Sequence, residues 1–439
     1  MGAGFTQEGS FFVPGGGAFV AGGSGGLPVN PFRDFTSGAT GPLPFNPTID
    51  LAFSTGQYFG VTGAPTSFLT TTNSGGLAVD SNGNWTTFGV NTPRITNLGL
   101  LVEESRTNLV LQSAALAGGW ATNQTTIVLG QVSPDGGTNA VSITDNSTGG
   151  TPHYFYGSSS GITTVAGTTY AFSAFFKAGT GGFAGISFAN GGFASGFYAC
   201  ANLQTGAITT SGLFGAGTLI SASAQLYPNG WVRITAVGTP GSTGPTFPIL
   251  SVIQNAAGTP LTNYAGTGST ILAWQPQAEA GAVTTSPIRT TSAAVTRAAD
   301  VVTLTSPPAF VAAYTLFANI VPQSPTSNVA AQVFAEANDG TATNAGAIYR
   351  VAGTGAAAAF LGGTGGTAST SAVNGALGLP ILTQNVSAKM ASAITGASGL
   401  NHFYIGSSPA GQQADGLISR VALWPTTALT GAQLQQITT

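Results

Sequence analysis

Alternating hydrophobic and polar residues recur along most of this chain. In residues 168–177, Tyr170, Phe172 and Phe176 alternate with mostly smaller side chains, and this period of two predicts a half-buried strand. Short segments of this kind are separated by turn signals such as Asn229-Gly230. Strands and turns that follow one another every ~8–12 residues are typical of sandwiches and barrels. The pattern therefore predicts an all-β protein.

The pattern also divides the chain into parts. Residues 49–104 contain short β-like pieces, with an Asn-Gly turn signal at Asn82-Gly83 between two of them. Residues 105–298 are predicted to form one β-sandwich, in which Trp231 and Trp274 belong to the core. Residues 299–439 are predicted to form a second, tandem β unit. That unit should end in a short helix, because Thr430 and Gln433 fit a capping box.

Two segments lack a clear period. Residues 1–48 are dominated by Gly and Pro, and spaced phenylalanines lie among them: Phe5, Phe11, Phe12, Phe19, Phe32, Phe35 and Phe45. Each ring is a large apolar anchor for a pocket on another subunit, so we expect an extended arm that becomes ordered on docking; a disordered tail is the alternative. Residues 353–376, rich in Gly, Ala and Thr, are predicted to form either a loop or small-residue strands packed at a symmetry axis.

Charged residues make up only 5% of the 439 residues, against about 25% in ordinary soluble proteins. Little charge repulsion keeps copies apart, and because the hydrophobic residues are patterned into strands, we expect an obligate part of an assembly rather than an aggregating chain. The 10 Lys and Arg are spread singly and the net charge is −3, which argues against nucleic-acid binding.

Targeting signals and redox chemistry are also not expected. The single Cys200 excludes an intrachain disulfide framework and is predicted to be a buried apolar residue. The first positive side chain is Arg33, so no signal peptide is predicted. No apolar run approaches the ~18 residues of a membrane span. We expect a protein that stays in the cytosol or leaves it inside a particle.

Catalytic motifs are not evident in the sequence. The two histidines, His153 and His402, show no metal-ligand spacing, so neither a zinc site nor another cofactor is predicted. Glu103 and Glu104 are adjacent and point to opposite faces of a strand, whereas a glycosidase needs two carboxylates facing one cleft. A partner for Glu103 at Asp80, Glu279 or Asp300 stays open. The prediction is a protein that is not an enzyme.

Two small sets of residues are candidates for other roles. Sugar binding uses exposed aromatic rings as stacking platforms, and the candidates are His153, Tyr154, Tyr156 and Tyr227; packing in the core or at an interface is the alternative. Scarce charges near residues 99–110 and 284–301 form the second set: Glu103, Arg106, Arg289, Arg297 and Asp300. We expect the arginines to pair with Glu103, Glu104, Asp300 or backbone carbonyls and so hold the seam where the ends of a domain meet; ligand binding is the alternative.

These two segments, GLLVEESRTNLV at 99–110 and TTSPIRTTSAAVTRAADV at 284–301, resemble the frame around a jelly-roll, carbohydrate-binding-module-like domain of bacteriophage tail and head fibres. The ending DGLISRVALW at 415–424, followed by ALTGAQLQQI at 428–437, resembles the end of concanavalin/laminin-G-like domains. The resemblance implies a jelly roll at 105–298 and a lectin-like sandwich at 299–439.

The same resemblance implies a place and partners. We expect a virion protein whose arm docks to capsid, portal/neck or tail proteins, which forms a homotrimer and which contacts host surface polysaccharide. The leading function is a tail or head fibre for host attachment. A capsid decoration protein without a receptor role and a polysaccharide depolymerase are the alternatives.

Overall fold

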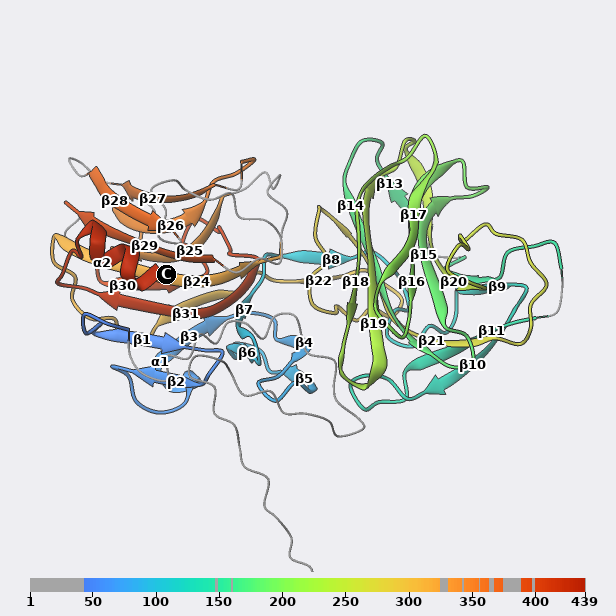
Figure 1. Cartoon of the computed structure of the whole chain (residues 1–439), viewed down its shortest axis with the longest axis horizontal. Coiled ribbons are helices and arrows are strands. Elements are labelled where there is room, and N and C mark those ends of the chain that lie inside the picture. The colour runs from blue at the N-terminus through green and yellow to red at the C-terminus, as the bar shows by residue number, and fades with distance from the viewer. Residues whose placement is uncertain are drawn as a thin grey trace, which may run out of the picture.

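The computed structural model describes residues 43–438 except 147–148, 159–160, 324–330, 342, 355, 363–366, 374–387 and 397–398. Within these residues the chain forms 31 strands, two short α-helices and one 3-10 helix, Pro228–Gly230, and neighbouring strands pair antiparallel throughout. The prediction of an all-β protein is confirmed. Four large sheets are arranged as two units, which lie side by side in Figure 1.

The unit on the right of Figure 1, here the inserted unit, holds two of these sheets. The proximal sheet has the order β10-β11-β21-β14-β19-β18, formed by Thr125–Gln131, Ala140–Asp145, Thr270–Ala280, Tyr170–Ala178, Trp231–Thr239 and Thr218–Leu226. The distal sheet has the order β17-β16-β15-β20-β12-β9 with β13 beside β20, formed by Ile208–Gly215, Ser195–Asn202, Phe183–Asn190, Gly244–Ile253, Tyr154–Tyr156, Ala121–Asn123 and Ile162–Thr164.

Side chains of both sheets share one core. Tyr170, Phe172 and Phe176 of β14 are buried in it, as their alternation predicts, and Phe188 of β15 meets them from the distal sheet. The rings of Phe172 and Phe188 stack with centroids 5.6 Å apart. Alternate residues of each strand therefore face inward, and the residues between them face away from this core.

The other unit, here the composite unit, is built from two distant parts of the chain. Its eight-stranded sheet has the order β2-β1-β31-β24-β29-β28, with β7 and β6 added beside β31; the strands are Gln57–Phe59, Ile49–Ala52, Gly416–Trp424, Ala313–Pro322, Ala388–Thr395, Thr367–Val373, Gly99–Val102 and Arg94–Thr96. Its six-stranded sheet has the order β27-β26-β25-β30-β23-β3, formed by Ala357–Gly362, Ala345–Arg350, Gln332–Asn338, His402–Ile405, Val301–Leu304 and Leu69–Thr72. The short helix α1, Pro65–Phe68, precedes β3.

The expected small β region at 49–104 does not stand alone. Leu51 of β1 is opposite Val421, Leu101 of β7 is opposite Leu417, and Leu69 of β3 is opposite Leu304. These strands complete the sheets of the C-terminal part and bury their side chains in its core. The predicted boundaries near 105 and 298 instead mark where the chain leaves the composite unit to form the inserted unit and where it returns. Local patterning identifies such strands but does not specify a partner more than 200 residues away.

The chain crosses between the units on two short strands. β8, Arg106–Asn108, pairs with β22, Val295–Arg297. Beside them a hairpin of β4, Gly76–Val79, and β5, Trp85–Phe88, packs against both units. Its Leu77 and Trp85 pack against Phe175, Trp231 and Trp274 on the proximal sheet. Its Ala78 and Phe88 pack against Leu101, Val321 and Leu417 of the composite unit.

Trp231 and Trp274 are thus buried, but outside the core between the two sheets of the inserted unit. They lie on the outer face of the proximal sheet, where the hairpin covers them. Trp274 also donates a 2.6 Å hydrogen bond from Nε1 to Asn139 Oδ1. The hairpin therefore supplies an apolar contact through which the inserted unit packs on the rest of the chain.

The two ends of the described chain meet on the composite unit. Phe45, expected to dock on another subunit, instead packs against its own chain in a cluster with Trp424 and Leu434, and its carbonyl accepts a 2.8 Å hydrogen bond from Trp424 Nε1. The other six arm phenylalanines lie outside the described residues. Helix α2, Gly431–Thr438, begins at the predicted capping box, in which Gln433 Oε1 accepts a hydrogen bond from Thr430 N. No helix among the described residues is long and apolar enough to cross a membrane.

Candidate functional site

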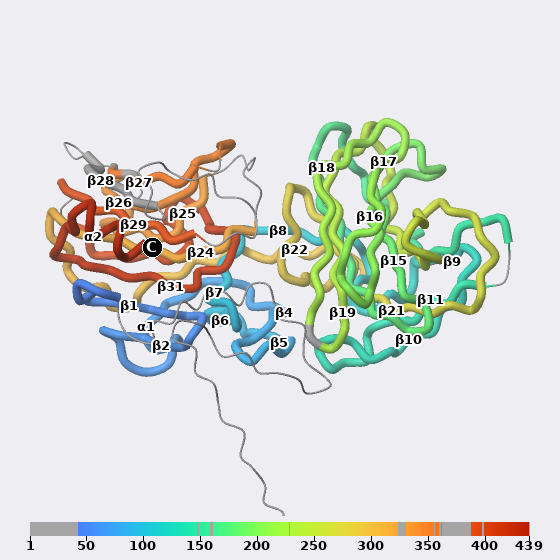
Figure 2. Tube along the Cα trace, viewed as in Figure 1, coloured from blue at the N-terminus to red at the C-terminus, as the bar shows by residue number. Residues whose placement is uncertain are grey.

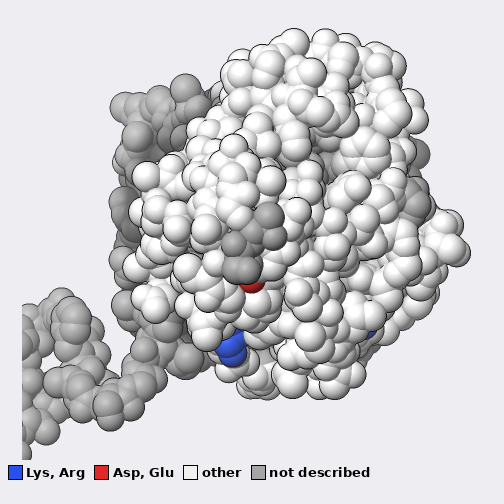
Figure 3. Space-filling model, turned by 90° about the vertical axis from the view of Figure 1, so that its right-hand side faces the viewer, with Lys and Arg blue, Asp and Glu red and all other residues white. Residues whose placement is uncertain are grey.

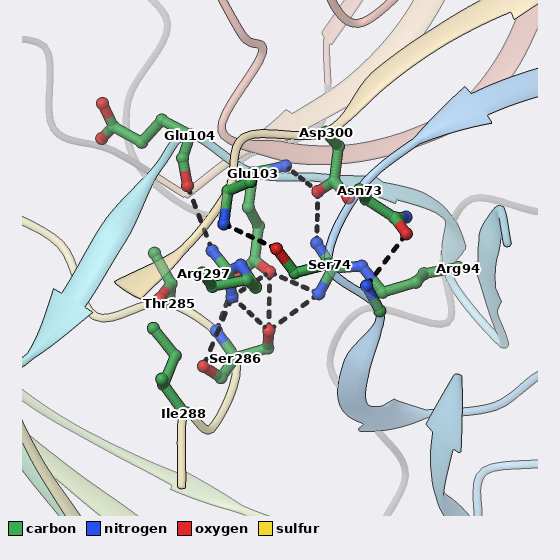
Figure 4. A network of polar contacts seen from close by, with 12 residues as sticks. Asn73, Ser74, Arg94, Glu103, Glu104, Thr285, Ser286, Ile288, Arg297 and Asp300 are labelled. Atoms are coloured by element: carbon green, nitrogen blue, oxygen red, sulfur yellow. Dashed lines mark hydrogen bonds and ion pairs between the residues drawn. The ribbon is translucent and has the colours of Figure 1, made fainter. Parts of the chain in front are cut away.

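Unusual groups of side chains occur at two places in the described structure. The first is a buried polar network at the seam between the units (Figure 4). Glu103 lies at its centre and is 1% exposed. Its Oε2 is 2.7 Å from Arg94 Nη1 and 2.8 Å from Arg297 Nη1. Ser286 donates to the same carboxylate from its backbone N and from its Oγ, each at 2.6 Å.

Asp300 extends this network. It forms an ion pair with Arg94, and its Oδ2 accepts a 2.8 Å hydrogen bond from Glu103 N. The backbone of Asp300 donates in return to Glu103 O at 2.9 Å. The network thus holds two guanidinium groups and two carboxylates, so its charges balance, and it ties residues 94–103 to residues 286–300.

The electrostatics of the network suit a structural role. Burial by itself raises the pKa of Glu103, but the charges of Arg297 and Arg94 and the Ser286 hydrogen bonds lower it to about 2. Burial, and the neighbouring charge of Glu103, raise the pKa of Asp300, although Arg94 opposes them. A carboxylate surrounded by donors and closed off from solvent cannot exchange protons with a substrate. The geometry therefore fits a structural ion-pair network that holds residues 94–103 and 286–300 together, rather than an acid–base catalytic site.

The predicted seam residues divide between two places. Glu103, Arg297 and Asp300 lie together in the network, and Arg106 lies next to it, paired with Glu104 and bonded to the carbonyl of Ala280. Arg289 lies elsewhere: it is exposed and pairs with Asp135 of the inserted unit. The scarcity of charges pointed to most of the set but not to Asp135, which is far from Arg289 in the sequence.

Arg94 and Ser286 are the network residues that sequence reasoning did not select. Arg94 is almost fully buried and bridges both carboxylates. Its position directly after Pro93, in a chain with only 10 Lys and Arg, was the available signal. Ser286 is one of many serines, and nothing local distinguishes it from the others.

The second feature is an aromatic cluster on the outer face of the distal sheet. Tyr154 and Tyr156 flank the core residue Phe155 on β12, so both rings point away from the core. They contact each other at 5.6 Å between centroids. Tyr154 also meets Phe193, and Tyr156 meets Phe247. With Tyr198 and Phe214 they form what we call the distal aromatic cluster: Tyr154, Tyr156, Phe193, Tyr198, Phe214 and Phe247.

Small residues and two unusual hydroxyls lie between these rings. Ser187 of β15 is opposite Tyr198 and Ile249, and Ser251 of β20 is opposite Tyr154 and Gly185. Both serines alternate with core residues and so belong to the outer face. Both are fully buried, yet neither Oγ has a hydrogen-bond partner within the part of the chain that the structure describes. An unpaired buried hydroxyl costs about 1–3 kcal/mol, which makes two neighbouring ones unusual.

The distal sheet also carries no charge. None of its seven strands contains Asp, Glu, Lys, Arg or His. Cys200 of β16 is fully buried in this sheet, and burial raises its pKa to about 12, so its thiol stays protonated. Figure 3, which views the side of the inserted unit turned away from the composite unit, is almost entirely free of charged atoms. A neutral, aromatic sheet face is therefore available for an uncharged ligand.

Two of the four residues predicted to bind sugar are placed differently. His153 is 1% exposed; its ring lies 4.3 Å from that of Tyr264, and its Nε2 is 3.1 Å from the carbonyl of Asn146. Tyr227 packs against Trp85 and Phe175 at the contact between the units, and burial raises its pKa. Both rings are occupied by packing, because the local aromatic pattern does not distinguish an exposed face from a covered one. Tyr154 and Tyr156 remain half-exposed candidates.

Among the described residues, no group of three or more His, Cys, Asp or Glu is placed to hold a metal ion. No protein-family model matches this sequence. No curated protein matches it at a significant level either. The described residues themselves thus supply the two clues to function: a buried ion-pair network between two β units, and a sheet face with an aromatic cluster and no charged residue in its strands.

Proposed function

We propose that this chain is a non-enzymatic structural protein of a phage virion, a tail or head fibre that attaches to the host surface. The resemblance carried by residues 99–110 and 284–301 supports it. In this proposal the inserted unit is a jelly roll of the carbohydrate-binding kind and the composite unit is lectin-like. The arm at 1–48 docks to capsid, portal/neck or tail proteins, and the chain assembles as a homotrimer.

The observation that carries the proposal is the distal aromatic cluster on a sheet without charged residues. The C–H face of a sugar ring is apolar and stacks on tyrosine or phenylalanine, whereas its hydroxyls need hydrogen-bond partners. Tyr154 and Tyr156 supply half-buried rings, each of which ends in a hydroxyl that can bond to a sugar, whereas Ser187 and Ser251 are fully buried between the rings. Because the sheet offers no cation, a neutral glycan suits it better than an acidic one.

A paired substitution tests this site. We expect Tyr154→Ala with Tyr156→Ala to weaken binding to host cells and to a glycan array by about tenfold or more, which corresponds to 1.4 kcal/mol. Tyr349→Ala with Tyr404→Ala is the matched control, because these two tyrosines are also half-buried but lie on the composite unit. Thermal melting of both variants separates lost binding from lost folding. Unchanged adsorption of the Tyr154/Tyr156 variant would remove the cluster from the proposal.

Two further measurements separate the rival functions. Immunogold labelling of purified particles with an antibody to residues 299–439 should mark fibres at the tail or head. Label spread over the capsid, together with no binding on the glycan array, would favour a decoration protein. Release of reducing sugars from host polysaccharide would instead favour a depolymerase. Particles without any label would contradict the virion assignment.

A further inference from the structure

The inserted unit has two open lateral edges, and the strands of both are uncharged. β17 and β9 are the terminal strands of the distal sheet, and β18 and β10 are the terminal strands of the proximal sheet. One edge of the unit is thus formed by β17 and β18, and the opposite edge by β9 and β10. Figure 2 shows β17 and β18 with no part of the composite unit drawn over them. In the described chain no further strand pairs with any of these four.

Exposed aliphatic side chains gather at these edges. Leu213 and Ile220, on β17 and β18, are 51% and 52% exposed. On β10 and just after it, Val128, Leu129 and Val132 are 53%, 49% and 68% exposed. These five account for half of the ten large hydrophobic residues that are exposed in the described structure. A surface aliphatic residue is ordinary when single, but groups of two and three on unpaired strands are not.

Two strand irregularities direct these side chains outward. The pairing of β18 with β19 shifts register between Leu219 and Ser221, so Ile220 is the extra residue of a bulge. The pairing of β10 with β11 shifts register between Val128 and Gln131, a stretch that contains Leu129. Bulges at sheet edges re-aim side chains and are features of function rather than defects. Each edge thus presents a bulged aliphatic residue to its surroundings.

Two of the usual protections of sheet edges, charged residues and proline, are missing from the described edge strands. Soluble proteins protect edge strands with charged residues or proline, yet β9, β10, β17 and β18 contain neither. The whole stretch 178–232 contains no charged residue. A partner on these edges must itself be neutral and apolar, since a charged partner would lose its hydration without gaining an ion pair. In a chain with 5% charged residues, a second copy of the same chain meets this requirement.

We propose that the β17–β18 edge of one copy binds the β9–β10 edge of the next copy. Two different surfaces on one subunit make a head-to-tail contact, and such contacts close into a ring when the rotation between subunits allows it. Exposed backbone groups of the edge strands pair across the contact while Leu213 and Ile220 pack against Val128, Leu129 and Val132. The inference deepens the proposed homotrimer by naming its contact, and it depends on neither the virion location nor the glycan.

Variants of each edge test the contact. Leu213→Lys with Ile220→Lys blocks one edge, and Val128→Lys with Leu129→Lys blocks the other. Light scattering should give a multiple of the 43.4 kDa chain mass for the natural protein, threefold for a trimer, and the single mass for either variant. An equimolar mixture of the two variants should give the twofold mass, because one intact copy of each edge remains. Val311→Lys, at a 46% exposed residue on the composite unit, should leave the mass unchanged.

The competing outcomes are distinct. A natural protein that stays at the single-chain mass at every concentration would overturn the proposal, and so would edge variants with the natural mass. If only the β17–β18 variant dissociates, the contact is twofold and the head-to-tail arrangement is wrong. Ser211→Lys, at an exposed position of β17, provides a second β17 variant that removes no apolar contact. Glycan binding by the single-chain variants would show that the proposed function holds even if the assembly does not.

Discussion

Glu336 shows at the residue scale how the few charges of this chain differ in role. It lies on β25 and is 5% exposed, and its Oε1 accepts a 2.7 Å hydrogen bond from Asn338 Nδ2. In the described part of the chain no ion pair joins it to a cation. Burial therefore raises its pKa to about 7, whereas the four groups of the seam network compensate one another.

Replacing Glu336 with Gln is predicted to stabilise the protein at pH 8 and not at pH 4. The folded-state pKa of Glu336 is raised above its ordinary value of 4.5, because the buried carboxyl is more stable when it is protonated. The free energy of unfolding is therefore highest, as far as this group is concerned, below about pH 4.5, and it falls as the pH rises through 7. The gain above pH 7 should reach at most about 3 kcal/mol. Chemical denaturation at the two pH values measures it. Asp339→Asn, a change at the neighbouring exposed acid, should give no such gain.

The hairpin β4–β5 shows how far a local pattern can predict an element and its packing. Its strands and its Asn-Gly turn follow from the local pattern, and the structure confirms them. Its packing against both units does not, because Leu77 and Ala78 are neighbours in the sequence yet pack on different units. A period of two indicates which residues share a face, but it cannot indicate whether another unit covers the opposite face.

Trp85→Ala is predicted to loosen this contact and destabilise the protein by about 3 kcal/mol. The indole lies 5.4 Å from the ring of Phe175 and 5.8 Å from that of Trp274, and it covers Trp274 and Trp231. The emission of these two tryptophans should shift to longer wavelength as water reaches them. Trp120→Ala is the control, because Trp120 packs on Phe155 inside the inserted unit; a red shift as large in that variant would contradict the covering role of the hairpin.

Because a local pattern does not show what covers a side chain, the sequence could indicate some site residues and not others. Charged residues are rare in this chain, so the sequence draws attention to Glu103, Arg297 and Asp300. Because so few opposite charges are available, each of these residues had to find its partner within a small set. His153 and Tyr154 are adjacent and equally aromatic in character, yet one is buried against Tyr264 and the other is half-exposed. What separates them is the direction of β12 relative to β20 and the loop that carries Tyr264, and neither relation is local in the sequence.

In the part of the chain that the structure describes, three contacts join the two units. The strands β8 and β22 cross between them, the hairpin β4–β5 packs on both, and the network around Glu103 ties residues on each side of the inserted unit. All three lie at the proximal side, so the distal sheet is left free. In the fibre that we propose, such a joint would hold the distal sheet at a constant angle to the composite unit.

Glu103→Gln tests whether the seam makes the molecule one cooperative body. The change leaves Arg94 and Arg297 buried with one carboxylate between them, and breaking a buried pair in this way costs about 3–5 kcal/mol. Each unit keeps its own core, so we expect calorimetry to resolve one transition in the natural protein and two in the variant. Arg289→Ala, which removes an ion pair in which the arginine side chain is 37% exposed, should cost less than about 1 kcal/mol and keep a single transition. A single unshifted transition in Glu103→Gln would mean that the hairpin and the crossing strands β8 and β22 couple the units without the network, which would then be a consequence of their packing rather than its cause.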